Sequence, residues 1–230
     1  MSQTSATLSP EFAKWPSLVS PARGDVLGKP LVKWQEQVRL SLQLPTDKPI
    51  IIVGHQPTFF HPGILAKFMA ASRLAKQIDG VLVFLVVDHH KGNTGHINTP
   101  IQGDHLSVQT KTIASVDASI AMKDQQRVEM LETFEPFTTA LQTSSGDTAS
   151  MQFANAIVNL MSPWVDIHHV ITASELLYSE FGVSIVSEMN VHPRLCRESY
   201  NNAVEQFPEC NIPILQEDEL PLWQEASNSK

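Results

Sequence analysis

The stretch that decides the fold is residues 49–98, PIIIVGHQPTFFHPGILAKFMAASRLAKQIDGVLVFLVVDHHKGNTGHIN. Its first part, residues 50–53, is short, β-branched and continuously apolar, which is typical of a strand covered on both faces. A second unbroken apolar run, residues 81–87, predicts another such strand. Asp79-Gly80 directly before it marks the end of the segment that connects the two runs.

The connecting segment has the period of an α-helix. Its apolar residues are spaced four and three apart, so they share one stripe of a helix: Ile64, Phe68, Ala71, Ala75 and Ile78. A strand, a helix and a strand within about 40 residues form a crossover unit. The two strands of such a unit pair in parallel, so the sequence predicts a parallel sheet.

Polar residues follow each predicted strand. In an open parallel sheet, ligands bind beyond the carboxyl ends of the strands. We therefore expect the two polar groups to face one ligand crevice. The groups are His55, Gln56 and His61 after the first strand, and Asp88, His89 and His90 after the second.

Composition limits the possible function classes. The 230 residues include 16 Lys and Arg and 24 Asp and Glu, a net charge of −8, which argues against a nucleic-acid or anionic-membrane binder. Cys196 and Cys210 form neither a disulfide framework nor a CxxC zinc motif. The chain shows no secretory signal and no apolar run of the roughly 20 residues that a spanning helix needs. We expect a cytoplasmic protein with a small-molecule partner, and a homo-oligomer stays open.

Three regions are expected: an N-terminal arm and helix (residues 1–47), a core (residues 48–190), and a C-terminal helix and tail (residues 191–230). Ser174 is expected to cap the helix that follows the last core strand. Periodicity predicts the remaining elements: one helical turn near residues 12–18; helices at 31–42, 124–134, 136–141, 151–161 and 174–189; strands at 104–113 and 168–172; and a final helix from Pro193.

His61-Pro62-Gly63 opens the helix after the first strand. The backbone N–H groups and the positive dipole of a helix start favour a phosphate or a carboxylate. Lys67 lies in the same first turn, where a cation is disfavoured unless an anion is near. One interpretation is an anion site formed by His61, Lys67 and the backbone. The other is a capped helix with a lysine that faces solvent.

The second polar group allows a metal ion or polar substrate contacts. Histidine and carboxylate side chains together suit zinc, manganese or iron, and the downstream candidates are Asn93, His96, Asn98, Asp104 and His105. Adjacent side chains on an extended segment point apart, which favours polar contacts over a metal. Thr172 and Ser174 end the last predicted strand, where their hydroxyls either bind phosphate or cap the next helix.

Residues 48–190 resemble the N-terminal core of the bacillithiol biosynthesis cysteine-adding enzyme (BshC) family. In that family a GQQPG-like turn follows the first strand, a helix with a lysine comes next, and the second strand ends in an EDHD-like sequence. The matching residues here are Gly54, Gln56, Pro57, Gly63, Lys67, Asp88 and His89. The ITASELL segment at residues 171–177 resembles a later strand-to-helix turn, and the differences fall at His55, His61, Val87 and His90.

The resemblance implies an α/β fold, a three-layer Rossmann-like parallel sheet with flanking helices, related to class I nucleotidylyltransferases. It implies a ligase-like enzyme of the cysteine-adding type that joins a carboxylate to an amine on a polar, anionic small molecule. One alternative is a nucleotidylyltransferase-like enzyme with a nucleotide as its cofactor, because His61-Pro62-Gly63 retains part of an HxGH motif. The other is a non-catalytic binding module, truncated relative to longer relatives.

The candidate site is defined by the two strand ends and the helix start. His61 and Lys67 are expected to hold the anionic group, and His89 or Asp88 to act as acid or base. The catalytic candidates are His89, Asp88 and His61. The ligand-binding candidates are Gly54, His55, Gln56, Gly63, Lys67, His90, Asn93, Thr172 and Ser174.

Overall fold

The computed structural model describes residues 10–21, 23–102, 105–217 and 219–220. The chain divides into two compact units, Met1–Leu176 and Leu177–Lys230. The first unit contains a parallel sheet with flanking helices, and the second is helical. Within the described residues, no helix has both the length and the apolar character needed to cross a membrane.

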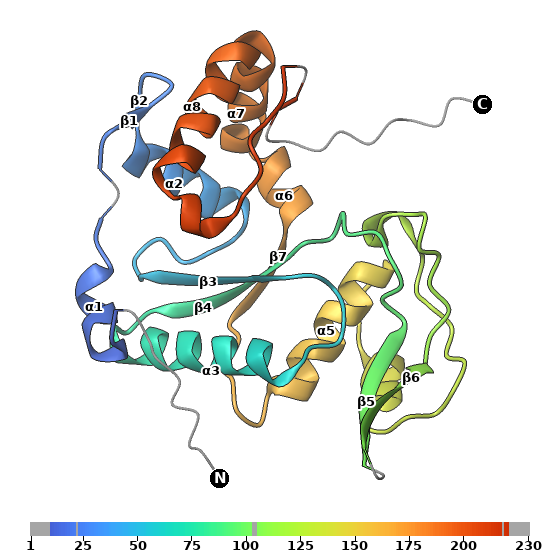
Figure 1. Ribbon diagram of the computed structural model, residues 1–230. Helices are drawn as coiled ribbons and strands as arrows, with labels where there is room; N and C mark the ends of the chain where they lie inside the picture. Colours follow the sequence, from blue (N-terminus) through green and yellow to red (C-terminus); the bar gives the residue numbers. More distant parts are fainter. Residues whose placement is uncertain (1–9, 22, 103–104, 218, 221–230) are drawn as a thin grey trace. The chain divides into compact units, whose positions relative to one another are not determined.

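A three-stranded parallel sheet forms the centre of the first unit (Figure 1). Its strands are β3 (Ile50–His55), β4 (Val81–Val86) and β7 (His169–Thr172), in the order β3-β4-β7. The helix α3 (Pro62–Gln77) connects β3 to β4. The predicted strand-helix-strand unit with a parallel pair is therefore confirmed, and so is the predicted strand at residues 168–172.

Alternation along the strands explains how the sheet is covered. Phe84 and Val86 of β4 point to one face, where they pack with Phe68 of α3 and Ile157 of α5 (Ala149–Met161). Figure 1 shows α3 and α5 on the same side of the sheet. The intervening strand residues point to the other face, where Leu44 covers them: Val81 and Val83 of β4, and Ile171 of β7. A mixed α/β unit with flanking helices results.

The N-terminal part of the chain contains short elements and one longer helix. The short elements are η1 (Phe12–Lys14), α1 (Trp15–Leu18), and the paired strands β1 (Asp25–Val26) and β2 (Lys29–Pro30). The helix α2 (Leu31–Ser41) follows directly. Both the helical turn predicted near residues 12–18 and the helix predicted at residues 31–42 are confirmed.

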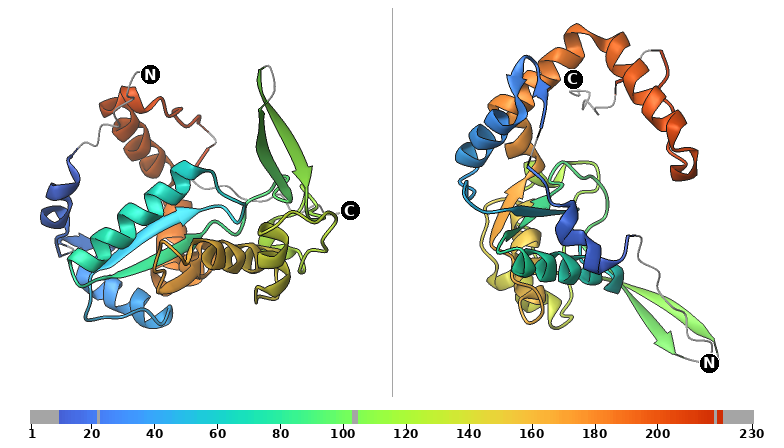
Figure 2. Two further views of the ribbon diagram at one scale, coloured as in Figure 1. Left: turned by 90° about the horizontal axis from the view of Figure 1, so that it is seen from below. Right: turned by 90° about the vertical axis from the view of Figure 1, so that its left-hand side faces the viewer.

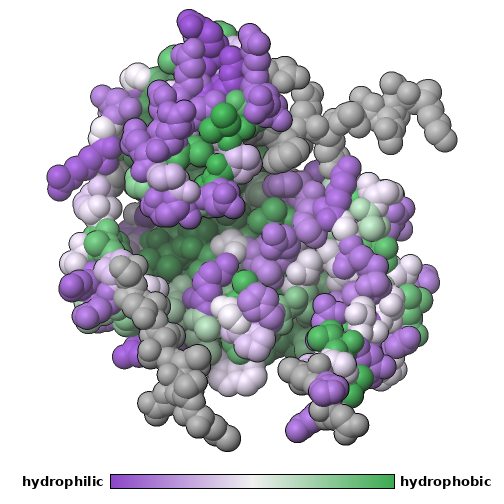
Figure 3. Space-filling view, viewed as in Figure 1, coloured by the Kyte–Doolittle hydropathy of each residue, from purple (hydrophilic) through white to green (hydrophobic). Residues whose placement is uncertain are grey.

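A long insertion separates β4 from β7. It contains the antiparallel ribbon of β5 (His96–Gln102) and β6 (Leu106–Thr112), then η2 (Met122–Asp124), α4 (Phe137–Thr143) and α5. Figure 2 shows the ribbon projecting from the rest of this unit. Figure 3 shows hydrophobic residues among hydrophilic ones over the ribbon, in keeping with the exposed Ile101 and Val108. The strand predicted at residues 104–113 is confirmed as β6, except for Asp104, which lies outside the described residues.

The helix predicted at residues 124–134 is wrong. After Asp124 this segment has no helix and forms isolated bridges at Gln126 and Met130. The amide of Val128 donates to Oε1 of Gln152 at 2.8 Å, and the amide of Leu131 donates to the carbonyl of Ile113 at 2.9 Å. Tertiary hydrogen bonds therefore override the local preference for a helix. The helices predicted at residues 136–141 and 151–161 are confirmed as α4 and α5.

The helix predicted at residues 174–189 is two helices, α6 (Ala173–Tyr178) and α7 (Glu180–Val191). Ser179 separates them, because its side chain accepts a hydrogen bond from the amide of Gly182 and caps α7. The final helix is α8 (Pro193–Gln206), as predicted, and a short turn, η3 (Pro208–Cys210), follows it.

Thr172, rather than Ser174, caps α6. Its hydroxyl accepts from the amide of Glu175 at 3.0 Å, and Oε2 of Glu175 accepts from the amide of Thr172 at 2.7 Å. This reciprocal pair is a capping box. The prediction that Ser174 is the cap was wrong because α6 begins at Ala173, which places the cap at Thr172, two residues earlier.

Replacing Thr172 with valine should lower the free energy of unfolding by about 1 kcal/mol, because valine keeps the strand shape but removes the capping hydroxyl. Ser174→Ala is the matched control, and it should change stability much less, since Ser174 uses its backbone amide in this region. Urea denaturation of both variants measures the difference. Equal losses would contradict the assignment of the cap.

Candidate functional site

The carboxyl ends of the three strands lie in one row. His55 of β3 is paired in register with Val86 of β4, and Val86 is paired with Thr172 of β7. Along β3, His55 shares the face of Val53, which packs in the core beneath α3. The residues that follow β4 therefore emerge beside His55, at the edge of the sheet where ligands of such folds bind.

His55 is the titratable side chain of this row. Its Nε2 atom is buried and has no hydrogen-bond partner. Burial lowers the pKa of His55, and the positive charges of Lys67, His61 and His90 lower this pKa further, while the Gln56 side chain opposes the shift. The imidazole is therefore held in its neutral form near pH 7, with one ring nitrogen available to a ligand.

The start of α3 is capped by His61. Its Nδ1 accepts a hydrogen bond from the amide of Gly63 at 3.1 Å, and its carbonyl accepts from the amides of Ile64 and Leu65 at 2.9 and 3.4 Å. A Cβ atom on Gly63 would lie 2.8 Å from the His61 ring, so this cap requires glycine. Pro62 has no amide hydrogen, so every amide of the first turn has an acceptor within the chain. An anion here would have to displace the cap or bind the His61 ring itself.

Lys67 reaches from α3 to the end of β3. Its Nζ donates to the carbonyl of Gly54 at 2.8 Å. The ammonium group is thus held beside His55, whose pKa it lowers. A cavity of about 280 Å³ borders this contact, and its walls include Gly54, Lys67 and the apolar residues Trp15 and Ile52.

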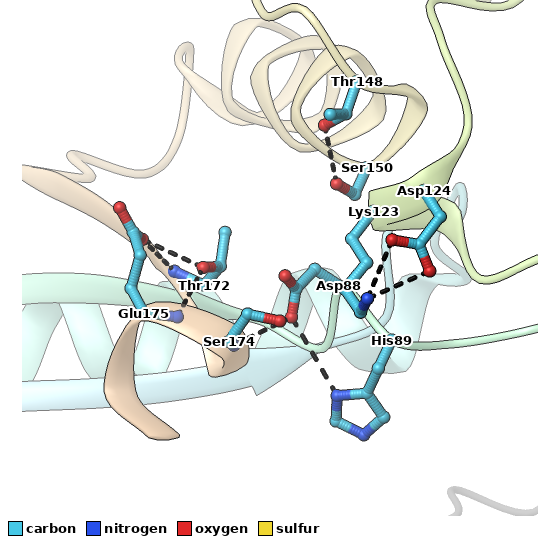
Figure 4. Close-up of polar contacts among 9 residues, drawn as sticks. All are labelled: Asp88, His89, Lys123, Asp124, Thr148, Ser150, Thr172, Ser174 and Glu175. Carbon is cyan, nitrogen blue, oxygen red and sulfur yellow. Dashed lines mark hydrogen bonds and ion pairs between the residues drawn. The ribbon is translucent and has the colours of Figure 1, made fainter. Parts of the chain in front are cut away.

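Asp88 connects the end of β4 to the start of α6 (Figure 4). The residue is only 3% exposed, and its Oδ1 accepts from the amide of Ser174 at 3.0 Å. Its carbonyl accepts from the amide of Lys123 at 2.9 Å. His89 is more exposed, and its Nδ1 lies 3.9 Å from Oδ1 of Asp88. Asp88 therefore fixes the loop that carries His89.

His90 and Asn93 lie further along the same loop. Burial lowers the pKa of His90, and the neighbouring His89 lowers it further. The side-chain amide nitrogen Nδ2 of Asn93 is hydrogen-bonded to Nε2 of His96 at 2.9 Å, so Asn93 has a partner at the start of β5. Among the residues that the structure describes, no three His, Cys, Asp or Glu side chains are grouped as a metal site requires. Asp104, one of the downstream candidates, lies outside that part of the chain.

The candidates thus form two neighbouring groups. The first group surrounds His55 at the end of β3, where Gln56, His61, Lys67 and His90 each affect its pKa. Asp88, His89 and Ser174 are in contact at the end of β4. The hydroxyl of Thr172 is engaged with Glu175.

Sequence reasoning missed Glu175 and Lys123. The T-x-x-E spacing of Thr172 and Glu175 is a capping-box signature, so Glu175 was within reach of the sequence. No local pattern indicates that the amide of Lys123 bonds to the carbonyl of Asp88. The Lys123 side chain forms an ion pair with Asp124 at 2.8 Å (Figure 4).

Comparison with known proteins finds no matching family model, no matching curated protein and no matching solved structure. The fold and the site themselves define an α/β protein that has several histidines at the carboxyl ends of a parallel sheet.

Proposed function

We propose that the first unit has a three-layer Rossmann-like core and that the protein is an enzyme of the cysteine-adding type. It would join a carboxylate to an amine on a polar, anionic small molecule, with release of water. The β3-α3-β4 order supports this proposal, and so does the position of Gly54, Gln56 and Lys67 at the end of β3, where the BshC resemblance expects ligand contacts.

The observation that carries the proposal is the buried Nε2 of His55, which lacks a partner. A buried polar atom without a hydrogen bond costs about 1–3 kcal/mol. Such an atom at the carboxyl end of a parallel strand, with a perturbed pKa, is typical of a functional site. We infer that a ligand group completes this hydrogen bond.

The roles follow from the contacts of each group. An amine that attacks a carboxyl carbon must lose a proton as the C–N bond forms, and a neutral imidazole accepts that proton. His55 suits this role better than Asp88, whose Oδ1 is already bonded to the amide of Ser174. Lys67 and the His61 ring would hold the anionic group, and His89 would protonate the departing oxygen.

Binding of an anion at the start of α3 is tested with two variants that spare the fold. His61→Asn removes the imidazole but retains a capping side chain, and Lys67→Met keeps the apolar stem but removes the charge. We expect each variant to weaken the binding of an aminosugar phosphate, used as the probe, by about tenfold. Calorimetry gives the dissociation constants.

Controls for this experiment are His105→Asn and Lys33→Met, which change an exposed imidazole and an exposed lysine elsewhere on the chain. Both should bind the probe as the native protein does. Unchanged affinity in both His61→Asn and Lys67→Met would reject the anion site.

Mixtures of the aminosugar phosphate with cysteine, or with ATP or CTP and magnesium, separate the alternatives. Cysteine and the aminosugar should give a product whose mass is their sum less one water. Consumption of ATP or CTP with magnesium and transfer of the nucleotidyl group would instead identify nucleotidylyl transfer. Binding without turnover in any mixture would identify a non-catalytic module.

A further inference from the structure

A second cavity of about 520 Å³ lies on α3, at a distance from the carboxyl ends of the strands. Its walls come from three segments of the first unit: Phe12 of η1, Trp164 of the α5–β7 connection, and Met69, Arg73 and Lys76 of α3. We propose that this cavity binds a small anion that carries a flat apolar ring. The proposal is independent of the function proposed for the carboxyl-end site.

The position of the cavity separates it from that site. Arg73 and Lys76 belong to the C-terminal half of α3, while His61 and Lys67 mark its beginning. Ten residues of α-helix span about 15 Å, so Gly63 and Arg73 are far apart along the helix axis. Neither His61 nor Lys67 is among the residues that line this cavity.

The walls favour an aromatic ligand. Trp164 is 58% exposed and Met69 is 44% exposed, although both are large and apolar. Phe12 forms a third apolar wall, and the guanidinium carbon of Arg73 lies 5.1 Å from the centre of its ring. A flat ring has aromatic and thioether groups to pack against here.

The charges favour an anion. The sequence of α3, PGILAKFMAASRLAKQ, contains three basic residues and no acidic one, in a chain whose net charge is −8. Within the described part of the chain, neither Arg73 nor Lys76 has an ion-pair partner. The helix dipole favours Lys76, which lies in the last turn, but Arg73 lies before that turn. The two cations border an apolar cavity and remain available to a carboxylate or a phosphate.

The volume fits a small molecule. Pockets that bind small ligands commonly measure about 300–1,000 Å³ and combine apolar walls with a few polar groups. A single aromatic ring system with one phosphate or carboxylate satisfies the size, the walls and the charge together.

The experiment uses 1-naphthyl phosphate as the probe and measures its dissociation constant for the full chain by calorimetry. We expect binding that weakens by about tenfold or more in Arg73→Gln and in Trp164→Ala. Trp164→Phe keeps a ring and should bind within a few-fold of the native protein. Two further ligands separate the contributions: 1-naphthol lacks the anion, inorganic phosphate lacks the ring, and each should bind at least tenfold more weakly than the probe.

The controls exclude a general effect of losing a positive charge and an effect of unfolding. Arg194→Gln removes an exposed arginine of the second unit and should leave the dissociation constant unchanged. Thermal unfolding of Arg73→Gln and Trp164→Ala should match that of the native protein, because both side chains are exposed. Absence of probe binding, equal binding by Arg73→Gln and Trp164→Ala, or phosphate binding as tight as that of the probe would each overturn the proposal.

Discussion

Replacing Phe84 with alanine is expected to lower the free energy of unfolding by about 3–5 kcal/mol, the cost typical of removing a buried aromatic ring. Phe84 is 0% exposed and lies in the central strand of the sheet. Its ring meets that of Phe68 edge to face, with the ring centres 5.2 Å apart. The substitution removes this pair and leaves a cavity between β4 and α3, which neighbouring side chains fill only partly.

Urea denaturation followed by far-ultraviolet circular dichroism measures the loss. Val108→Ala is the control, because Val108 is 68% exposed on β6 and its removal should change the free energy of unfolding by less than about 0.5 kcal/mol. Phe84→Leu keeps part of the buried volume and should lie between the two. A loss below about 1 kcal/mol in Phe84→Ala would show that the two faces of the sheet are not packed as described.

The central unit could be predicted from the sequence because its signals are local. The continuous apolar run that became β4 is covered on both faces, and buried parallel strands are the elements that show such runs. The run that became β3 is buried mainly on the face of Val53, because Ile52 on the opposite face is 52% exposed. The helical stripe between them is equally clear, since Phe68, Ala71 and Ala75 all lie in the core. Local pattern and tertiary environment agree here, so periodicity is sufficient.

The insertion between β4 and β7 could not be predicted in the same way. The strand β5 contains Pro100, which argues against a central strand, but in a two-stranded ribbon each strand has a free edge that tolerates proline. The amides of Val128 and Leu131 depend on partners that are distant in the sequence. The break between α6 and α7 depends on the N-cap at Ser179. The residues around Ser179 are also compatible with a continuous helix, so the sequence does not indicate the break.

The location of the candidate site in the sheet could be predicted from the sequence, but the hydrogen bonds of its side chains could not. Strand ends and the parallel pairing locate His55, Lys67 and Asp88 at one edge of the sheet. The sequence does not show that Nε2 of His55 lacks a partner, or that Asp88 is bonded to the amide of Ser174, because both depend on side-chain packing. For this reason sequence reasoning assigned the acid or base role to Asp88 or His89, while our proposal assigns the base to His55 because its Nε2 atom is buried without a partner.

Replacing His55 with glutamine is expected to lower the turnover of the cysteine-adding assay by about 10²–10⁴-fold, the range for loss of a general base. Glutamine is similar in size and forms hydrogen bonds, but it does not accept a proton near pH 7. In the native protein the rate should rise with pH through the lowered pKa of His55, because the base must be neutral. His105→Gln, which changes an exposed imidazole, should leave the rate and its pH profile unchanged.

The pH dependence of stability tests the same group without a substrate. Because the folded state lowers the pKa of His55 below the ordinary value of about 6.5, the unfolded chain binds more protons as the pH falls through 6.5. The native protein should therefore lose stability between pH 6.5 and the lower folded pKa, and His90 contributes with the same sign. Above pH 6.5 both states hold neutral imidazole, so neither residue contributes there. His55→Gln should reduce this loss and His105→Gln should not. An unchanged loss in His55→Gln would mean that His55 titrates alike in both states, and this would remove the physical basis for its role as the base.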